Sequence, residues 1–355
     1  MNMKNDNMEN VYALLDEFIE KSKKLVCKHP YLVIIAMHEY FRNIWPNDPI
    51  IEEKLADDKL ESIILCLKNC LNLLSSAEKI GSYFACKELL TEFKNLDEKG
   101  EKDHSQTQTV YGKLWKSLDD NYLIQDTKNI LINLFEQNGM NVDILKDKMV
   151  LDMGCGSGRF TIALAQLGVK NVIGVDLGES GLKIGEKQSK DLDLKNIQFM
   201  KESVLSLPFE DETFDFVFSK GVLHHTGQLE KGLNEFQRVL KPGGNGFLYL
   251  YGSGGLFWNS RKKMREVMKD IPMNYTLGVL DTIGMPSQRY VFADSWYVPI
   301  EEHVERKWLE EFLLNKFSKI TKVENSGEST IQSMSNSPYS NELWGDGELR
   351  YFLTK

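Results

Sequence analysis

The chain has 355 residues, a formal net charge of −9 and 42% hydrophobic residues, a composition typical of globular proteins that argues against disorder. Because a single domain usually has about 100–200 residues, we expect two domains. The acidic balance disfavours DNA or RNA as a partner, since nucleic-acid-binding proteins usually carry a basic face. The polar start lacks the apolar segment of a signal peptide, and no uninterrupted run of about 18 apolar residues predicts a membrane span, so we expect a cytoplasmic protein.

The cysteines are odd in number and lie in a large chain, so we expect them to be reduced thiols. Cys66 and Cys70 are four residues apart in an apolar helical pattern, and only Cys86 lies near them. A zinc site needs further ligands at defined spacing. Core packing therefore explains this pair better, and we predict no metal site.

Residues 1–97 are predicted to form an N-terminal bundle of helices. Apolar residues recur at helical spacing within 11–19, 31–45, 55–74 and 83–96, and prolines or a glycine separate these stretches. The pattern is specific for helices but does not indicate a function.

The segment 98–109 is almost wholly polar and is predicted to be a linker. A second domain over 110–355 follows, and it begins with another helical pattern that ends near residue 145. An insertion at about 252–298 contains many Gly, Met and aromatic residues. Since it follows the carboxyl end of a predicted strand, we expect it to face a substrate.

From residue 149 onward, short apolar runs alternate with amphipathic helical segments. Strands that alternate with helices indicate βαβ units and a parallel sheet covered on both faces. We predict an α/β fold with a doubly wound, mostly parallel sheet of seven strands, next to the N-terminal α-helical domain. The predicted strands are MVLDM (149–153), NVIGVDL (171–177), IQFMK (197–201), FDFVFS (214–219), GFLYLY (246–251), FSKITKVEN (317–325) and GELRYFLTK (347–355).

The segment VLDMGCGSG (150–158) joins the first of these strands to a helix. Gly154, Gly156 and Gly158 allow a sharp turn and let a ligand lie against the backbone, next to the free N–H groups of the helix N-terminus. Dinucleotide-binding proteins favour G-x-G-x-x-G, whereas this segment is G-x-G-x-G and is preceded by Asp152. A carboxylate there would repel a pyrophosphate but suits an ammonium group or hydroxyls. The motif therefore favours a cationic amino acid–nucleoside over NAD.

This segment resembles motif I of class I S-adenosylmethionine-dependent methyltransferases, and further segments match that family in order. They are NVIGVD (171–176) for the second strand, SVLSLPF (203–209) for the adenine segment, FDFVFS and GVLHHT (221–226) for the fourth strand and its loop, and RVLKPGG (238–244) for the turn before the fifth strand. The resemblance covers about 145–252. It implies a Rossmann-like sheet with S-adenosylmethionine as cofactor.

The resemblance also implies the cofactor contacts. Asp176 matches the acid that binds both ribose hydroxyls, since a carboxylate accepts two hydrogen bonds from a diol. Ser203 stands where the family has an acid for the adenine amine, which weakens that contact. Tyr111 and Trp115 lie on an aromatic helix that could contact the sulfonium by cation–π attraction, with ordinary packing as the alternative. The expected contacts are Asp152, Gly154, Cys155, Gly156, Gly158, Asp176, Leu177, Ser203, Val204, Ser219, Tyr111 and Trp115.

His224 and His225 are the candidate catalytic residues. Methyl transfer from a sulfonium is an in-line displacement that depends mainly on alignment, and a base is needed only if the acceptor must lose a proton. Both histidines follow the fourth strand, where substrate would meet cofactor, and histidine titrates near neutral pH. The alternative is that they cap the following helix, and the sequence does not distinguish one histidine from the other.

The resemblance implies a biosynthetic methyltransferase that acts on a small molecule at oxygen, nitrogen or carbon. The segment 219–222 departs from the (Asn/Asp)-Pro-Pro-(Tyr/Phe) element of enzymes that methylate bases or amides, which argues against those acceptors. One alternative is a protein or RNA methyltransferase that docks its substrate on the N-terminal helices, and another is a non-catalytic scaffold. The helices could also form a homodimer contact or a substrate lid.

Overall fold

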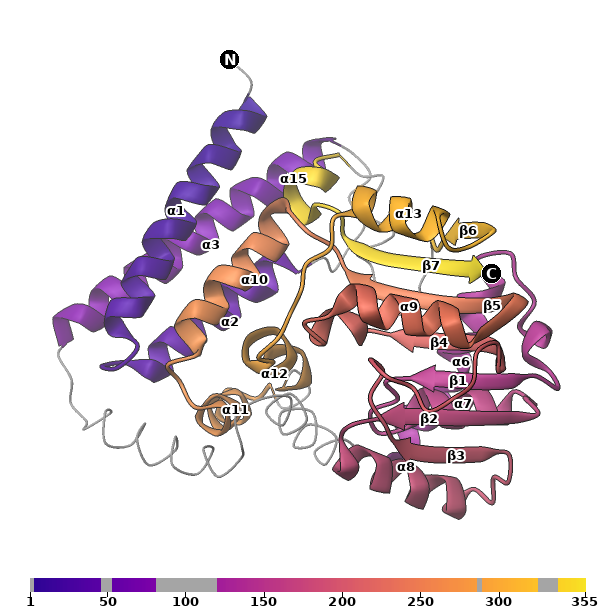
Figure 1. Ribbon diagram of the computed structural model, residues 1–355. Helices are drawn as coiled ribbons and strands as arrows, with labels where there is room; N and C mark the ends of the chain where they lie inside the picture. Colours follow the sequence, from indigo (N-terminus) through magenta and orange to yellow (C-terminus); the bar gives the residue numbers. More distant parts are fainter. Residues whose placement is uncertain (1–2, 46–52, 81–119, 286–288, 325–337) are drawn as a thin grey trace. The chain divides into compact units, whose positions relative to one another are not determined.

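The computed structural model describes residues 3–45, 53–80, 120–285, 289–324 and 338–355 (Figure 1). The chain forms two compact units, and each is built from separate stretches of sequence. The helical unit comprises Met1–Lys102, Gly254–Val298 and Met334–Gly345. The sheet unit comprises Asp103–Ser253, Pro299–Ser333 and Asp346–Lys355.

The described part of the helical unit consists of helices. Its helices are α1 (Met3–Leu25), α2 (Pro30–Ile44), α3 (Glu53–Ile80), α10 (Gly255–Met268), α11 (Met273–Thr282), α12 (Arg289–Tyr297) and α15 (Ser340–Trp344). Helices α1, α2 and α3 pack on one another, and α10 packs on α1, α2, α12 and α15. The predicted helices in 11–19, 31–45 and 55–74 are confirmed, whereas 83–96 and the boundaries at 97 and 110 lie outside the described residues.

The segment Gly254–Val298 packs with the N-terminal helices within the helical unit. The Tyr40 hydroxyl of α2 lies 2.8 Å from the Ser260 hydroxyl of α10. Within the segment, the buried Arg261 guanidinium donates to the Asp294 carboxylate at 3.1 Å. Aromatic rings from α2, α10 and α12 fill the space between the helices, namely those of Phe41, Phe257, Phe292 and Trp296.

The stretch Leu55–Lys79 of α3 is long and apolar enough to cross a membrane, judged by length and composition only. This is weak evidence for a span, because the core helix of a soluble protein passes the same test. One face of α3 is indeed buried within the helical unit, including Leu60, Leu67 and Leu74.

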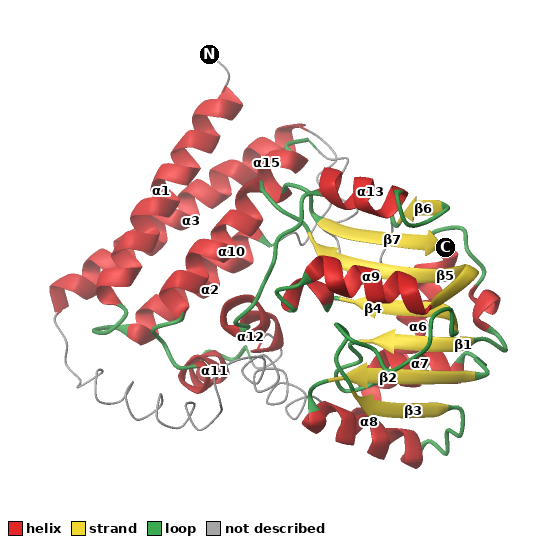
Figure 2. Cartoon of the chain, viewed as in Figure 1, coloured by secondary structure: helices red, strands yellow, loops and turns green. Residues whose placement is uncertain are grey.

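The sheet unit contains a seven-stranded sheet in the order β3-β2-β1-β4-β5-β7-β6 (Figure 2). Strands β1 to β5 are parallel, and β7 is antiparallel to both β5 and β6. The predicted fold class, a mostly parallel Rossmann-like sheet of seven strands, is confirmed. The strands are β1 (Met149–Met153), β2 (Asn171–Asp176), β3 (Ile197–Lys201), β4 (Phe214–Lys220), β5 (Leu240–Tyr251), β6 (Lys319–Lys322) and β7 (Glu348–Thr354).

Helices cover both faces of this sheet, because its strands are apolar on both sides. Side chains of α6 and α7 pack on one face with Val150, Phe218 and Phe247, and those of α9 and α13 pack on the other with Leu151 and Leu248. The helices of the sheet unit are α6 (Asp120–Glu136), α7 (Arg159–Gln166), α8 (Glu179–Asp191), α9 (Leu229–Val239) and α13 (Arg306–Leu314), with short 3-10 turns η1 (Val142–Leu145) and η2 (Leu223–His225).

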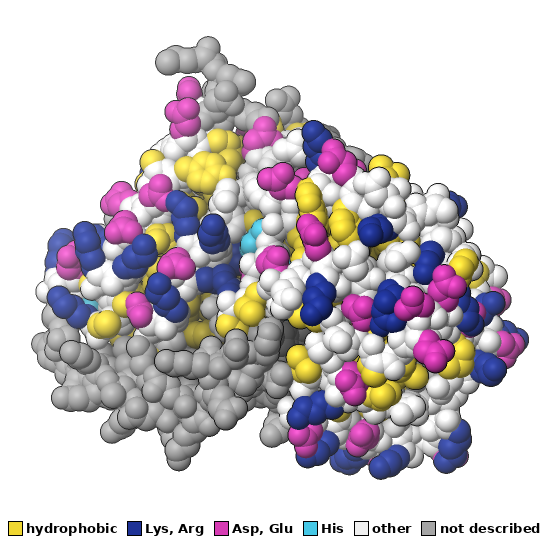
Figure 3. All heavy atoms as spheres, in the orientation of Figure 1, with side chains coloured by type: hydrophobic (Ala, Val, Ile, Leu, Met, Phe, Trp, Pro, Cys, Tyr) yellow, Lys and Arg dark blue, Asp and Glu magenta, His cyan; other side chains and the backbone are white. Residues whose placement is uncertain are grey.

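Acidic and basic side chains are interspersed over the described part of the face shown in Figure 3. Many of the basic side chains pair locally with acids, as Lys183 does with Glu179 and Lys241 with Asp215. Such local pairing gives the described part of this face a mixed surface.

Candidate cofactor-binding site

The polar residues that the sequence singled out gather at the carboxyl edge of the parallel strands. Asp152 and Met153 end β1, Asp176 ends β2, and Ser219 lies at the end of β4. Neighbouring parallel strands bring their carboxyl ends to one edge of the sheet, which is where ligands of such folds bind. Because β1 lies between β2 and β4, the glycine loop after β1 stands at the centre of this edge.

The loop from Gly154 to Gly158 is held by backbone hydrogen bonds to the end of β2. The N–H groups of Gly154 and Cys155 both donate to the Val175 carbonyl, at 2.8 and 2.9 Å. Gly154 has φ +89°, and a Cβ there would lie 2.3 Å from the Val222 side chain. Gly158 has φ +81°, and a Cβ there would lie 2.5 Å from the Phe199 ring. At these two positions glycine is therefore required by the protein's own packing, and not only by the approach of a ligand.

The Asp176 carboxylate connects the glycine loop to the end of β2. Its Oδ2 accepts a hydrogen bond from the Gly156 N–H at 2.9 Å, and its Oδ1 accepts one from the Gly178 N–H at 2.7 Å. The pKa of Asp176 is raised above its usual value, because the effect of burial outweighs that of the hydrogen bonds from the backbone N–H groups of Gly178, Gly156 and Leu177. A carboxylate held in this way can also accept hydrogen bonds from a vicinal diol.

Asp152 is a buried carboxyl group on the sheet face that α7 covers. It follows Val150 by two residues, so both side chains lie on that face. The Thr161 hydroxyl of α7 donates to Asp152 Oδ2 at 2.6 Å, and the side chain is 3% exposed. Burial raises the pKa of Asp152 to about 7, with a further contribution from the Asp176 charge, while Thr161 and Arg159 act in the opposite direction. A cationic group of a ligand would favour the ionised form.

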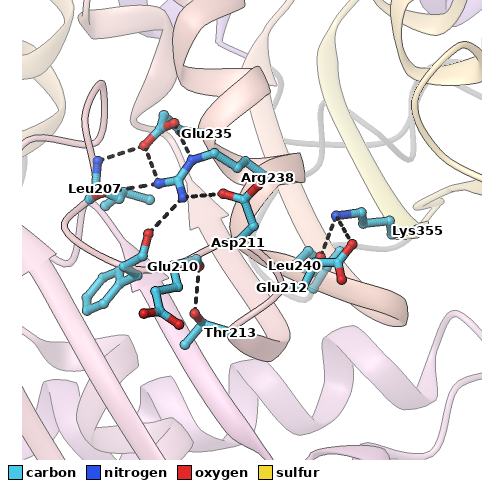
Figure 4. Close-up of polar contacts among 10 residues, drawn as sticks. Leu207, Glu210, Asp211, Glu212, Thr213, Glu235, Arg238, Leu240 and Lys355 are labelled. Atoms are coloured by element: carbon cyan, nitrogen blue, oxygen red, sulfur yellow. Dashed lines mark hydrogen bonds and ion pairs between the residues drawn. The ribbon is translucent and has the colours of Figure 1, made fainter.

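The segment that resembles the adenine-contacting motif is fixed by Arg238 of α9 (Figure 4). The guanidinium donates to the carbonyl oxygens of Phe209 and Leu207, at 2.7 and 3.1 Å. It also donates to both carboxylate oxygens of Glu235 and to Asp211 Oδ1, and Glu235 in turn accepts the Leu207 N–H at 2.7 Å. This network lowers the pKa of Glu235 and holds the segment against α9. In the sequence, Arg238 was evident only as part of a turn motif.

The remaining expected contacts occupy distinct positions at the edge. Val204 is buried, and the Ser203 hydroxyl accepts the Leu205 N–H at 3.2 Å. The Ser219 side chain is fully buried, and its hydroxyl donates to the Met153 carbonyl at 3.3 Å, which links β4 to β1. Burial raises the pKa of the Cys155 thiol well above its usual value, so this thiol is neutral.

The two histidines after β4 differ in their surroundings. The His224 ring is fully buried and stacks on the Tyr251 ring with 3.9 Å between centroids. His225 Nδ1 lies 2.7 Å from the Ile300 carbonyl oxygen. A carbonyl only accepts hydrogen bonds, so Nδ1 carries the proton and the lone pair of the neutral ring is on Nε2. The structure thus separates two residues that the sequence did not distinguish.

Residues 299–304, which we name the return segment, hold this pair of histidines in place. The Glu302 N–H donates to the His224 carbonyl at 2.8 Å, and the Val304 N–H donates to the Tyr251 carbonyl at 3.0 Å. The sequence did not indicate this segment, because its hydrogen-bond partners lie about 50–80 positions away in the chain.

Tyr111 and Trp115, the expected aromatic contacts to the cofactor, lie outside the described residues. Within the described ranges, no group of three or more His, Cys, Asp or Glu side chains could hold a metal ion.

Residues 151–248 match the protein family described as "Methyltransferase domain". The chain is similar to demethylmenaquinone methyltransferases from Staphylococcus carnosus (strain TM300), at 34% identity over 40% of this chain and 60% of the relative, and from Bacillus subtilis (strain 168), at 29% identity over 42% and 76%. The match thus spans less than two thirds of the Staphylococcus relative. A solved structure, that of PKMT2 from Rickettsia typhi, aligns over 64% of this chain and 53% of its own, with 19% identity and a TM-score of 0.46. The part of the chain around residues 151–248 is a class I S-adenosylmethionine-dependent methyltransferase domain.

Proposed function

We propose that this protein binds S-adenosylmethionine at the carboxyl edge of the sheet and transfers its methyl group to a small molecule. The main support is the pair of carboxyl groups on either side of the glycine loop, the buried Asp152 and the half-buried Asp176. Asp176 suits the ribose hydroxyls, and Asp152 suits the ammonium group of the methionine part. The relatives are named for methylation of demethylmenaquinone, which is a small-molecule acceptor.

In this proposal the protein contributes mainly alignment, because the sulfonium is already activated for displacement. The acceptor atom attacks the methyl carbon, the carbon–sulfur bond breaks, and S-adenosylhomocysteine leaves with the bonding electron pair on sulfur. Holding the acceptor, carbon and sulfur in line can contribute about 7–11 kcal/mol.

His225 is the better candidate for a base where the acceptor must lose a proton. Its hydrogen bond to Ile300 places the proton of the neutral ring on Nδ1 and the lone pair on Nε2, the atom that would accept a proton from the acceptor. His224 is fully buried against Tyr251, and its backbone carbonyl accepts the Glu302 N–H. We therefore assign His224 to positioning of the turn.

Isothermal titration with S-adenosylhomocysteine tests the cofactor part of the proposal. The wild-type protein should bind this ligand, and Asp176→Asn should bind it at least about 10-fold more weakly, because a charge-assisted hydrogen bond is lost. Circular dichroism should show that the variant is folded. If the wild-type protein does not bind S-adenosylhomocysteine, the cofactor site is wrong and the scaffold alternative is favoured.

Transfer of a radiolabelled methyl group tests the acceptor class. The protein and labelled S-adenosylmethionine are incubated with a bacterial extract, which is then separated into small-molecule, protein and RNA fractions. We expect the label in the small-molecule fraction, and a His225→Asn variant should transfer it more slowly with unchanged affinity for S-adenosylhomocysteine. Label confined to protein or RNA would contradict a small-molecule acceptor.

A further inference from the structure

One carboxylate of the return segment lies at the N-terminus of α9, directly after the turn that carries the two histidines. The Glu302 side chain accepts hydrogen bonds from the backbone N–H groups of Gly227 and Leu229. Leu229 is the first residue of α9, and the residue before it, Gln228, makes no side-chain hydrogen bond that caps the helix. The Gln228 N–H donates to the Thr226 hydroxyl oxygen at 3.2 Å. Three successive N–H groups at the start of this helix are thus satisfied, two of them by Glu302.

The return segment also contacts the histidine turn through its backbone. The Glu302 N–H donates to the His224 carbonyl at 2.8 Å, and the Ile300 carbonyl oxygen lies 2.7 Å from His225 Nδ1. The Ile300 side chain lies beside Gly227, where an added Cβ would be 3.8 Å from it. The return segment therefore contacts the turn before, at and after His225.

A carboxylate suits the position that Glu302 occupies. The N–H groups at the start of a helix carry partial positive charge, which favours a negative side chain. The pKa of Glu302 is raised above its usual value, because the effect of burial outweighs that of the hydrogen bonds from Gly227 and Leu229. A side chain without an acceptor atom would leave these two N–H groups without this partner.

The neighbouring side chains of the return segment make a different connection. His303 Nδ1 lies 3.0 Å from the Gly252 carbonyl oxygen, and its Nε2 lies 2.9 Å from Glu301 Oε1. Gly252 directly follows β5, so this pair connects the segment to the sheet. Glu302 connects the same segment to α9.

We propose that Glu302 is a positioning residue for His225, an inference that rests on the proposed function. By binding the start of α9, Glu302 keeps the Ile300 carbonyl against His225 Nδ1 and so keeps the proton of the neutral ring on that atom. A histidine ring without such a partner carries its proton mainly on Nε2, where it would prevent proton transfer from the acceptor. Glu302 thus selects the tautomer in which Nε2 can act as the base.

Nitrogen NMR of the histidine rings tests this role in the absence of cofactor. Two-bond ¹H–¹⁵N spectra at about pH 8.5, above the range in which histidine usually titrates, distinguish the protonated ring nitrogen from the unprotonated one. Comparison with His225→Asn assigns the His225 signals. In the wild-type protein Nδ1 should carry the proton, and in Glu302→Ala the proton should move mainly to Nε2. Glu302→Gln should keep the wild-type pattern, because its amide oxygen still accepts an N–H.

Glu305→Ala is the matched control for these variants. Glu305 is the exposed N-cap residue of α13, and its side chain makes no capping hydrogen bond. This variant should therefore keep the wild-type NMR pattern. Thermal unfolding shows whether each variant remains folded. If Glu302→Ala does not fold, Glu302→Asp takes its place, because the shorter side chain reaches the two N–H groups less well, and it should move the proton in the same direction.

The rate of labelled methyl transfer to the small-molecule fraction of a bacterial extract, at saturating S-adenosylmethionine, gives a second readout. Glu302→Ala should lower this rate about 5-fold or more with unchanged affinity for S-adenosylhomocysteine, since the base is then mostly in the wrong tautomer. Glu302→Gln should stay within about 2-fold of the wild-type rate, because it retains the hydrogen-bond acceptor.

The proposal is wrong if Glu302→Ala, or Glu302→Asp in its place, keeps the proton on Nδ1, or if the wild-type protein carries it on Nε2. Movement of the proton without any change in the transfer rate would also contradict it. A failure of the proposed function is distinguishable, because the wild-type protein would then not bind S-adenosylhomocysteine, whereas the NMR pattern could still be measured.

Discussion

Asp152→Asn should stabilise the ligand-free protein at pH 8 while weakening its binding of the cofactor. In the folded protein, burial raises the pKa of this carboxyl group from 3.8 to about 7. Below pH 4 the group is neutral in both the folded and the unfolded state, so it imposes no cost. Between pH 4 and 7 only the folded state keeps the proton, so stability falls as the pH rises. Above pH 7 the ionised group destabilises the fold by a constant amount.

The size of this effect follows from the difference of about three between the two pKa values. At about 1.4 kcal/mol for each pKa unit, the raised pKa lowers the free energy of unfolding by up to about 4 kcal/mol at pH 8 and by about 1 kcal/mol at pH 4.5. Asparagine carries no such cost, and its amide oxygen can still accept the Thr161 hydroxyl. The variant should therefore gain stability over the wild-type protein, and the gain should be larger at pH 8.

Urea unfolding of both proteins without ligand, at pH 4.5 and pH 8, measures this difference. Isothermal titration with S-adenosylhomocysteine should show binding that is about 10-fold or more weaker in the variant, because the ammonium group loses its anionic partner. A variant that is less stable than the wild-type protein at pH 8, or a gain that is equal at both pH values, would refute the reasoning about Asp152.

Gly156→Val should abolish binding of S-adenosylhomocysteine in a titration, because valine is strained at φ +57° and the Gly156 N–H holds Asp176. Arg238→Met should lower the free energy of unfolding by about 1–3 kcal/mol in urea and weaken cofactor binding, since the segment 207–211 loses its contacts to α9. His225→Asn should lower kcat with no change in affinity for S-adenosylhomocysteine, measured by methyl-transfer kinetics and titration.

Each of these predictions has a control. Gly168→Val also places valine at a positive φ, +82°, without any atom within 4 Å of the added Cβ, so it should retain binding. Arg238→Lys should recover only part of the stability, because lysine cannot reproduce the paired contacts to Glu235. A loss of activity in His224→Asn that matches His225→Asn, in an equally stable variant, would contradict the separate roles of the histidines.

The glycine loop illustrates how far local sequence could predict this protein. Three glycines at alternate positions after a short apolar run predicted a tight turn, and the structure confirms positive φ at Gly154, Gly156 and Gly158. The predicted reason for these glycines, a sharp turn and the approach of a ligand, was only partly correct. The side chains of Val222 and Phe199 occupy the space that a Cβ would need at Gly154 and Gly158. A sequence shows that a residue must be small, but it does not show what packs against it.

Contacts between distant parts of the chain were not predictable in the same way. The sequence indicated an insertion at about 252–298, but the packing of 254–298 with the N-terminal helices depends on residues more than 200 positions away, as between Tyr40 and Ser260. The same holds for the hydrogen bond from His225 to Ile300, which assigns the proton on the ring.

The sequence by itself determined the seven strands, their alternation with helices, and the order of polar residues at the strand ends. These features depend on apolar periodicity and turn residues, which act over a few positions. Only the tertiary structure decided which groups from distant segments meet: the Asp176 carboxylate with the Gly156 N–H, the Arg238 guanidinium with the Leu207 carbonyl, and the Lys220 ammonium with the Phe160 ring. Such pairs form because packing brings distant segments together, and no local pattern carries that information.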